Sequence, residues 1–164
     1  MSVKLAQLTE HLISLAFIPR ENLESWVDIC TVIPESINHG HYQEICRLHH
    51  KCTLMIERYT GDSRLITAWM TAWLNDNDPD RDRDRMPDPD IDVEALDASG
   101  TTWDIDITLE FVEPVLVVED QNGVIPWNGL NWSVIDEPII DTARHVEWVT
   151  PSAEKAFISG KVIL

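Results

Sequence analysis

The spacing of apolar residues predicts two amphipathic helices. Near the N-terminus, apolar residues recur at intervals of three and four, and the stripe that they form predicts a helix ending before Pro19. Its members are Leu5, Leu8, Leu12 and Leu15. A second helix follows Asp62-Ser63, a pair typical of a helix N-cap. Its broad apolar face comprises Leu65, Ile66, Trp69, Met70 and Trp73.

Runs rich in β-branched and aromatic residues predict strands between these helices and after them. The predicted strands cover residues 23–33, 42–59, 91–96 and 102–118. Pro34 stops the first strand and Pro114 breaks or bends the last, because proline cannot donate a hydrogen bond to a strand ladder. We expect the first two strands to form an antiparallel hairpin.

These elements predict an α+β fold with an antiparallel sheet of about four strands and two helices packed on one face. The fold occupies residues 1–120, and an irregular C-terminal extension covers residues 121–164. The proline-rich run of alternating charges before strand three predicts a solvated loop. The expected core residues are Leu8, Leu12, Val27, Ile29, Leu48, Leu54, Ile56, Trp69, Trp73, Ile105, Ile107 and Leu109.

The predicted hairpin of strands three and four carries an acidic face. Apolar and acidic residues alternate from Trp103 to Phe111, so one face of the strand is apolar and the other is charged. Residues 86–143 contain fourteen acidic residues and no Lys, Arg or His. The candidate interaction residues on the outer face are Asp92, Glu94, Asp104, Asp106 and Glu110.

Like charges opposed across a hairpin destabilise it, so this face needs an explanation. It binds cations, contacts a basic partner or repels a polyanion. A two-metal nuclease also uses clustered carboxylates, but it must hold phosphate, and this region has no basic residue for that purpose. Repulsion, or solubility alone, is the better explanation.

Composition narrows the function classes further. The 164 residues are 44% hydrophobic, which favours a folded domain, and the net charge of -17 disfavours a nucleic-acid-binding surface. The N-terminus lacks the continuous apolar region of a signal peptide, and no apolar run approaches the length of a membrane helix. With three cysteines, which cannot all pair, we expect a soluble protein in a reducing cytoplasm.

Other candidate chemistry is weak. Cys46, His50 and Cys52 share one strand face with apolar residues at a spacing unlike that of zinc sites, so we assign them to the core. The run Asp80, Asp82, Asp84 starts like a calcium loop but lacks its glycine and its final Glu. Nucleotide-binding and hydrolase motifs are absent from the sequence. We therefore expect no catalytic residue, no metal and no cofactor.

The order of motifs resembles the tail completion protein R family of contractile-tailed phages. An N-terminal helix leads to a strand with Trp26-Val27-Asp28, and a long aromatic-containing strand follows. Next come a helix with the sequence TAWMTAWLNDNDP and the alternating strand WDIDITLEFVEPVLV. The resemblance covers roughly residues 3–120 and depends on the order of these motifs, because each alone is common.

The resemblance implies a structural tail terminator and not an enzyme. Such a subunit assembles as a ring, expected to be a homohexamer, on the head-proximal end of the tail tube. It stops tube growth and joins the tail to the head, so its implied partners are the tail tube protein, a neck or head-completion protein and the sheath. The protein would be assembled in the host cytoplasm and would belong to the virion, with DNA passing through the ring without specific binding and no membrane partner.

Two further interpretations concern the surfaces of this chain. Trp127, Trp132 and Trp148 lie among turn signals in the extension, and they either contact a neighbouring subunit or cap the sheet of their own chain. The acidic hairpin faces the lumen of the ring or a neighbouring ring, where it would repel DNA phosphates. The alternative to a terminator is an acidic DNA mimic that inhibits a DNA-binding enzyme.

Overall fold

The computed structural model describes residues 2–15 and 18–136, and it contains the two predicted helices and all four predicted strands. The bounds of its elements are α1 Val3–Ser14, η1 Arg20–Asn22, β1 Leu23–Asn38, β2 Gln43–Tyr59, α2 Ser63–Asn77, β3 Asp90–Ala95, β4 Trp103–Glu119, β5 Ile125–Trp127 and β6 Leu130–Ile135. In the described part of the chain, neither helix is long and apolar enough to cross a membrane.

Short polar side chains begin both helices. The Asp62 carboxylate accepts a hydrogen bond from the Arg64 backbone N–H at 2.9 Å, which confirms the predicted N-cap of α2. The Ser2 hydroxyl caps α1 in the same way by accepting from Leu5 N–H at 3.1 Å. These bonds satisfy N–H groups that have no partner within their helix.

The sheet has six strands, so the prediction of about four strands was wrong. Its order is β1-β2-β4-β6-β5, and β3 pairs with β4 beside this path. The two additional strands, β5 and β6, form an antiparallel hairpin within the extension that was expected to be irregular. The pattern missed them because β5 has only three residues, too few for a period to show.

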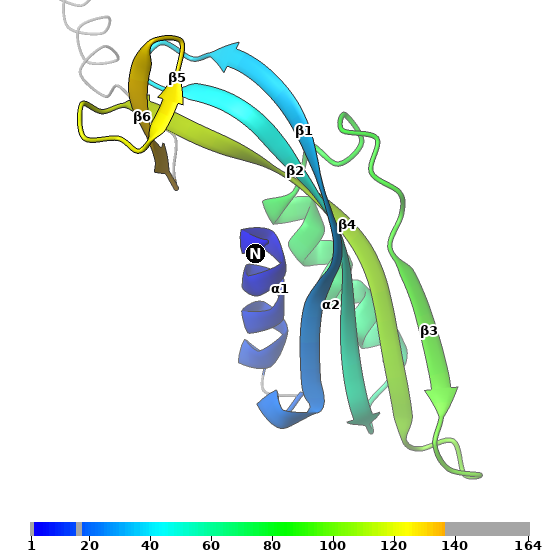
Figure 1. The fold of residues 1–164 in the computed structure, drawn as a ribbon. Helices are drawn as coiled ribbons and strands as arrows, with labels where there is room; N and C mark the ends of the chain where they lie inside the picture. Colours follow the sequence, from blue (N-terminus) through cyan, green and yellow to red (C-terminus); the bar gives the residue numbers. More distant parts are fainter. Residues whose placement is uncertain (1, 16–17, 137–164) are drawn as a thin grey trace, which may run out of the picture. The chain divides into compact units, whose positions relative to one another are not determined.

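The chain divides into two compact units. Unit 1 comprises residues 1–37 and 44–115 and contains both helices, β3 and most of β1, β2 and β4 (Figure 1). Within it the strand order is β1-β2-β4-β3. Unit 2 comprises residues 38–43 and 116–164, and in it β6 pairs with the last residues of β4, from Leu116 to Glu119.

A single apolar cluster fills unit 1. Alternating residues of β2 and β4 point into it, as the period-two pattern predicts, and one stripe of each helix joins them. Ten of the twelve expected core residues belong to the cluster: eight are buried in it, and Val27 and Trp69 pack against it as partly buried side chains. Leu48 is half-buried and lies outside the cluster.

Ile29 was expected in the core and instead is 58% exposed. In the first part of β1 the odd residues face inward, since Val27 packs against the core, while Asp28 accepts a hydrogen bond from Thr53 on the outer face of β2. Ile29 and Thr31 nevertheless line a surface hollow with outer-face residues of β2. Asp28 and Ile29 therefore both face outward, and after them the odd-numbered residues of β1 lie on the outer face of the sheet. A β-bulge produces such a change of alternation.

Pro34 does not end its strand, contrary to the expectation, and the last strand continues through Pro114 as expected. β1 continues through Pro34 to Asn38 because β1 is an edge strand, where one side of the backbone needs no ladder hydrogen bonds. Pro114 lies within β4, between the segments paired with β3 and with β6. β3 pairs with β4 only up to Thr108, and β6 pairs with it only from Leu116. In the described chain Pro114 therefore has no partner residue on this side of β4, and its missing N–H group is tolerated.

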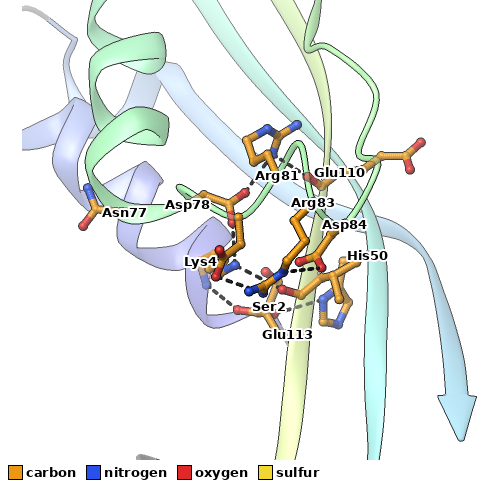
Figure 2. A network of polar contacts seen from close by, with 12 residues as sticks. Ser2, Lys4, His50, Asn77, Asp78, Arg81, Arg83, Asp84, Glu110 and Glu113 are labelled. Atoms are coloured by element: carbon orange, nitrogen blue, oxygen red, sulfur yellow. Dashed lines mark hydrogen bonds and ion pairs between the residues drawn. The ribbon is translucent and has the colours of Figure 1, made fainter. Parts of the chain in front are cut away.

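The charged run after α2 is the loop that its composition predicts, with most of its side chains exposed, but Arg81 within it bonds to β4. The Arg81 guanidinium donates to the backbone carbonyl of Glu110 at 2.8 Å (Figure 2) and to that of Pro87 at 2.9 Å. It also lies over the ring of Phe111. The Glu110 carbonyl belongs to the stretch of β4 that neither β3 nor β6 pairs with. A second arginine, Arg47 of β2, contacts Asp84 of the same run at 3.4 Å.

Asp78 joins this run to the first helix. Its carboxylate, with only 3% of the side chain exposed, contacts Lys4 Nζ at 2.6 Å and Arg81 at 2.9 Å. Lys4 also donates to the carbonyl of Val112, and its backbone N–H donates to Glu113 at 2.7 Å. The first turn of α1, the end of α2 and β4 are therefore held by one polar network (Figure 2).

His50 extends the network into the core. Its Nδ1 lies 3.0 Å from Glu113 Oε2, although the angle does not satisfy a hydrogen bond. Burial lowers the pKa of His50 below its ordinary value of 6.5, against the attraction of Glu113, which raises it. The imidazole is therefore neutral in the folded protein at neutral pH.

We expect Asp78→Ala to lower the free energy of unfolding by about 3 kcal/mol, because two partly buried cations would lose their shared carboxylate. Asp82→Ala is the matched control, since Asp82 is exposed in the same run, and it should change the value by less than about 0.5 kcal/mol. Urea unfolding monitored by tryptophan fluorescence measures both. Equal effects would show that the network does not stabilise the fold.

We expect acid to destabilise the protein partly through His50. Because the pKa of His50 is lowered by folding, the unfolded chain binds this proton first, and stability falls as the pH drops below about 6.5. His50→Gln should reduce the loss of stability between pH 7 and 5, whereas His11→Gln, on α1, should leave it unchanged. Urea titrations across this range test the difference, and identical slopes for wild type and His50→Gln would contradict it.

Candidate interaction surfaces

The structure brings the acidic residues of β3 and β4 together. The register sets Asp92 opposite Asp106 and Glu94 opposite Asp104. Asp92, Glu94 and Asp106 are exposed, and Asp104 and Glu110 are half-buried. We call these five residues the acidic surface. Two pairs of like charges therefore face each other directly, an arrangement that costs stability.

Two members of the acidic surface have partners within unit 1. Glu110 contacts His49 of β2, with 2.5 Å between Oε2 and Nε2, and this contact is an ion pair only when the imidazole is protonated. Asp104 accepts a hydrogen bond from the backbone N–H of Arg58 at 2.9 Å. For Asp92, Glu94 and Asp106 the described residues provide no hydrogen bond or ion pair, so their charges are met by solvent alone. The unpartnered part of the surface is the tip formed by β3 and its neighbour residues on β4.

Toward β1 and β2 the same side of the sheet carries cations. Arg47 lies among three carboxylates, those of Glu35, Glu44 and Asp84, at 2.7 to 3.4 Å, so its charge is neutralised. Lys51 is exposed, and within the described chain it has no ion pair. It lies beside the exposed Ile29 and Thr31 around a hollow of about 180 Å³. The charge of this side of unit 1 is therefore unevenly distributed between its two edges.

Two of the three tryptophans proposed for subunit contacts are paired with each other in unit 2. Trp132 is 5% exposed, and its indole N–H donates to the carbonyl of Trp127 at 2.9 Å. Their ring centroids are 5.3 Å apart, and Trp127 is half-buried. This pair holds the β5–β6 hairpin together. Trp148 lies outside the described residues, and a subunit contact by the tryptophans stays a prediction.

Cys52 is a buried thiol and Cys46 a half-buried one. Burial raises the pKa of Cys52 to about 12 and, to a smaller extent, that of Cys46. The thiolates that zinc or a nucleophilic reaction needs are thus disfavoured. In the described part of the chain no group of three or more His, Cys, Asp or Glu residues could hold a metal ion.

Comparison with known proteins identifies one family. The family model described as P2 phage tail completion protein R (GpR) matches residues 2–138 of the chain. The match includes both helices, all six strands and the acidic surface. No curated protein and no solved structure matches the chain significantly.

We expect Asp106→Asn to stabilise the protein by about 0.5 kcal/mol at low ionic strength, because it removes a like-charge contact with Asp92. Asp90→Asn removes the same charge two residues before Asp92, but Asp90 is opposite Thr108, so its effect should be smaller. Urea unfolding in 20 mM and 500 mM NaCl measures both variants. The difference should shrink at high salt, and a larger gain for Asp90→Asn would contradict the register argument.

Proposed function

This chain belongs to the family of the P2 phage tail completion protein R, and we propose that it is the terminator of the tail tube. Family membership implies a role in completing a phage tail and a place in the virion tail. The proposal adds that six copies form a ring on the head-proximal end of the tube. The ring stops tube growth and presents a surface to a neck or head-completion protein, with the sheath as a further neighbour.

The acidic surface supports this proposal independently of the family. Three carboxylates without partners in the described chain lie opposite other carboxylates across the hairpin, where the like charges destabilise it. DNA that passes through a ring must not bind to its wall, and carboxylates repel phosphates where lysines would bind them through counterion release. We propose that the acidic surface faces the channel of the ring.

The helices support this orientation. Unit 1 has one face of β2 and β4 in the apolar cluster with α1 and α2, and the acidic surface lies on the other face. A ring subunit can therefore direct the sheet toward the channel and the helices away from it. The proposed arrangement of two helices on one face of the sheet leaves the charged face accessible.

Oligomeric state tests the ring. Light scattering over a range of concentrations, with negative-stain imaging of any large species, should reveal a ring of six subunits. Purified ring added to growing tail tubes should shorten them. A protein that neither assembles nor changes the length of the tubes would contradict the terminator proposal.

Charge reversal tests the channel. We expect a ring with Asp92→Lys, Glu94→Lys and Asp106→Lys to retain double-stranded DNA at 50 mM salt and to release it at 300 mM. The matched control reverses Glu10, Glu21 and Asp76, which are exposed on or beside the helices and give the same net charge. Gel-shift measurements compare the two. If both rings bind DNA equally, the acidic surface does not line the channel, whereas the terminator function would be unaffected.

The same unpartnered carboxylates favour one other function, an acidic DNA mimic that inhibits a DNA-binding enzyme. This function requires a monomer or dimer that binds a basic protein in a salt-sensitive manner. The oligomeric state measured above therefore distinguishes the two functions.

A further inference from the structure

Unit 1 has two free strand edges. Its strands follow the order β1-β2-β4-β3, and within the described residues β1 pairs only with β2 and β3 only with β4. A free edge presents a row of unpaired backbone N–H and C=O groups, which a strand from another chain can bind. From these edges we infer that β3 of one copy pairs with β1 of the next copy in the ring; the inference rests on the proposed function.

The exposed side chains of β1 indicate that this edge is covered in the assembly. Ile29 and Val32 are 58% and 57% exposed, and Ile33 is also exposed. Because the alternation of β1 changes after Asp28, Ile29 and Ile33 lie on one face of the strand and Val32 lies on the other. Neither the helices nor the sheet covers these apolar side chains. A long apolar edge of this kind promotes aggregation in a monomer and is stabilised by a pairing strand.

The charges on the two edge strands disfavour contacts between identical edges of two copies. Pairing β3 with a second β3 in antiparallel register sets Asp92 opposite its own copy and Asp90 opposite Glu94, which are like charges. Pairing β1 with a second β1, centred on Thr31 and Val32, sets Asp28 opposite Glu35. Both symmetric contacts are therefore destabilised by repulsion.

The contact between β1 and β3 avoids these repulsions. Residues 29–33 of β1 contain no charge and can pair with five of the six residues of β3, whereas Pro34 has no N–H group to donate to that strand. Lys51 on the adjacent strand lies beside Ile29 and Thr31, and it has no ion pair in the described chain. It is a cation beside this edge that can offset the exposed carboxylates of a neighbouring β3.

Strand direction agrees with this contact. The two edge strands β1 and β3 run in opposite directions (Figure 1). A copy rotated about an axis roughly along the strands therefore places its β1 antiparallel to β3 of its neighbour, and the alternation of the sheet continues. Because the two joined edges are different, the contact is head-to-tail and can repeat until the ring closes.

Paired substitutions at Thr31 test the contact. Thr31 is exposed, so Thr31→Glu and Thr31→Lys should fold alike. Opposite an acidic β3, we expect Thr31→Glu to raise the concentration for half-assembly at least tenfold and Thr31→Lys to leave it unchanged or lower. The same two changes at Thr67, exposed on α2, are the control and should have equal effects. Analytical ultracentrifugation measures assembly, and 500 mM NaCl should reduce the difference at Thr31.

Disulfide mapping identifies the two edges. The exposed native Cys30 of β1 is combined with Glu94→Cys or Ala95→Cys of β3, on opposite faces of that strand, in a Cys46→Ser background. A head-to-tail contact should give a ladder of cross-linked species up to the full ring in one of the two variants. Cross-linking through Cys30 alone would instead give only dimers and would overturn the inference.

The outcomes separate this inference from the proposed function. A ring that shows no ladder and tolerates Thr31→Glu as well as Thr31→Lys would overturn the edge contact and leave the terminator function standing. A protein that remains monomeric at every concentration and does not act on tail tubes would overturn both.

Discussion

The fold of unit 1 depends on the buried carboxylate of Asp78. It contacts Lys4 at the start of the chain and Arg81 in the run after α2, and both cations also donate to carbonyls of β4. Without this carboxylate, two partly buried cations would lack a counterion, which costs more than an exposed ion pair contributes. One side chain thus determines where the helices and the charged run meet the strand that carries the acidic surface.

The edge strand β1 imposes the second constraint. It tolerates Pro34 because one side of its backbone has no partner, and the reversal after Asp28 turns Ile29 outward. Both features would be destabilising in a central strand. In an edge strand they leave sixteen residues extended, with apolar side chains on both faces. The conformation of β1 is therefore better explained by a contact outside the monomer than by the core.

The sequence predicts the elements whose signal is local. The stripe of Leu8 and Leu12, the cap at Asp62 and the alternation through Ile105 and Ile107 each depend on neighbours within a few residues, and all were confirmed. The acidic surface was predictable for the same reason. The position of β1 at an edge and the bonds of Arg81 to β4 depend on residues far away in the chain. The period therefore gave the wrong result for Ile29, and composition did not reveal how the charged run contacts β4.

The opposed carboxylates separate what the monomer requires from what the assembly requires. Nothing in the described residues uses the charges of Asp92 and Asp106, and removing one of them would relieve repulsion. Glu110, by contrast, has a partner in His49. A position that lowers stability without serving the fold points to a requirement outside the monomer. For a member of a phage tail completion family, the polyanion that passes through the tail is the physical agent that such charges would keep from binding.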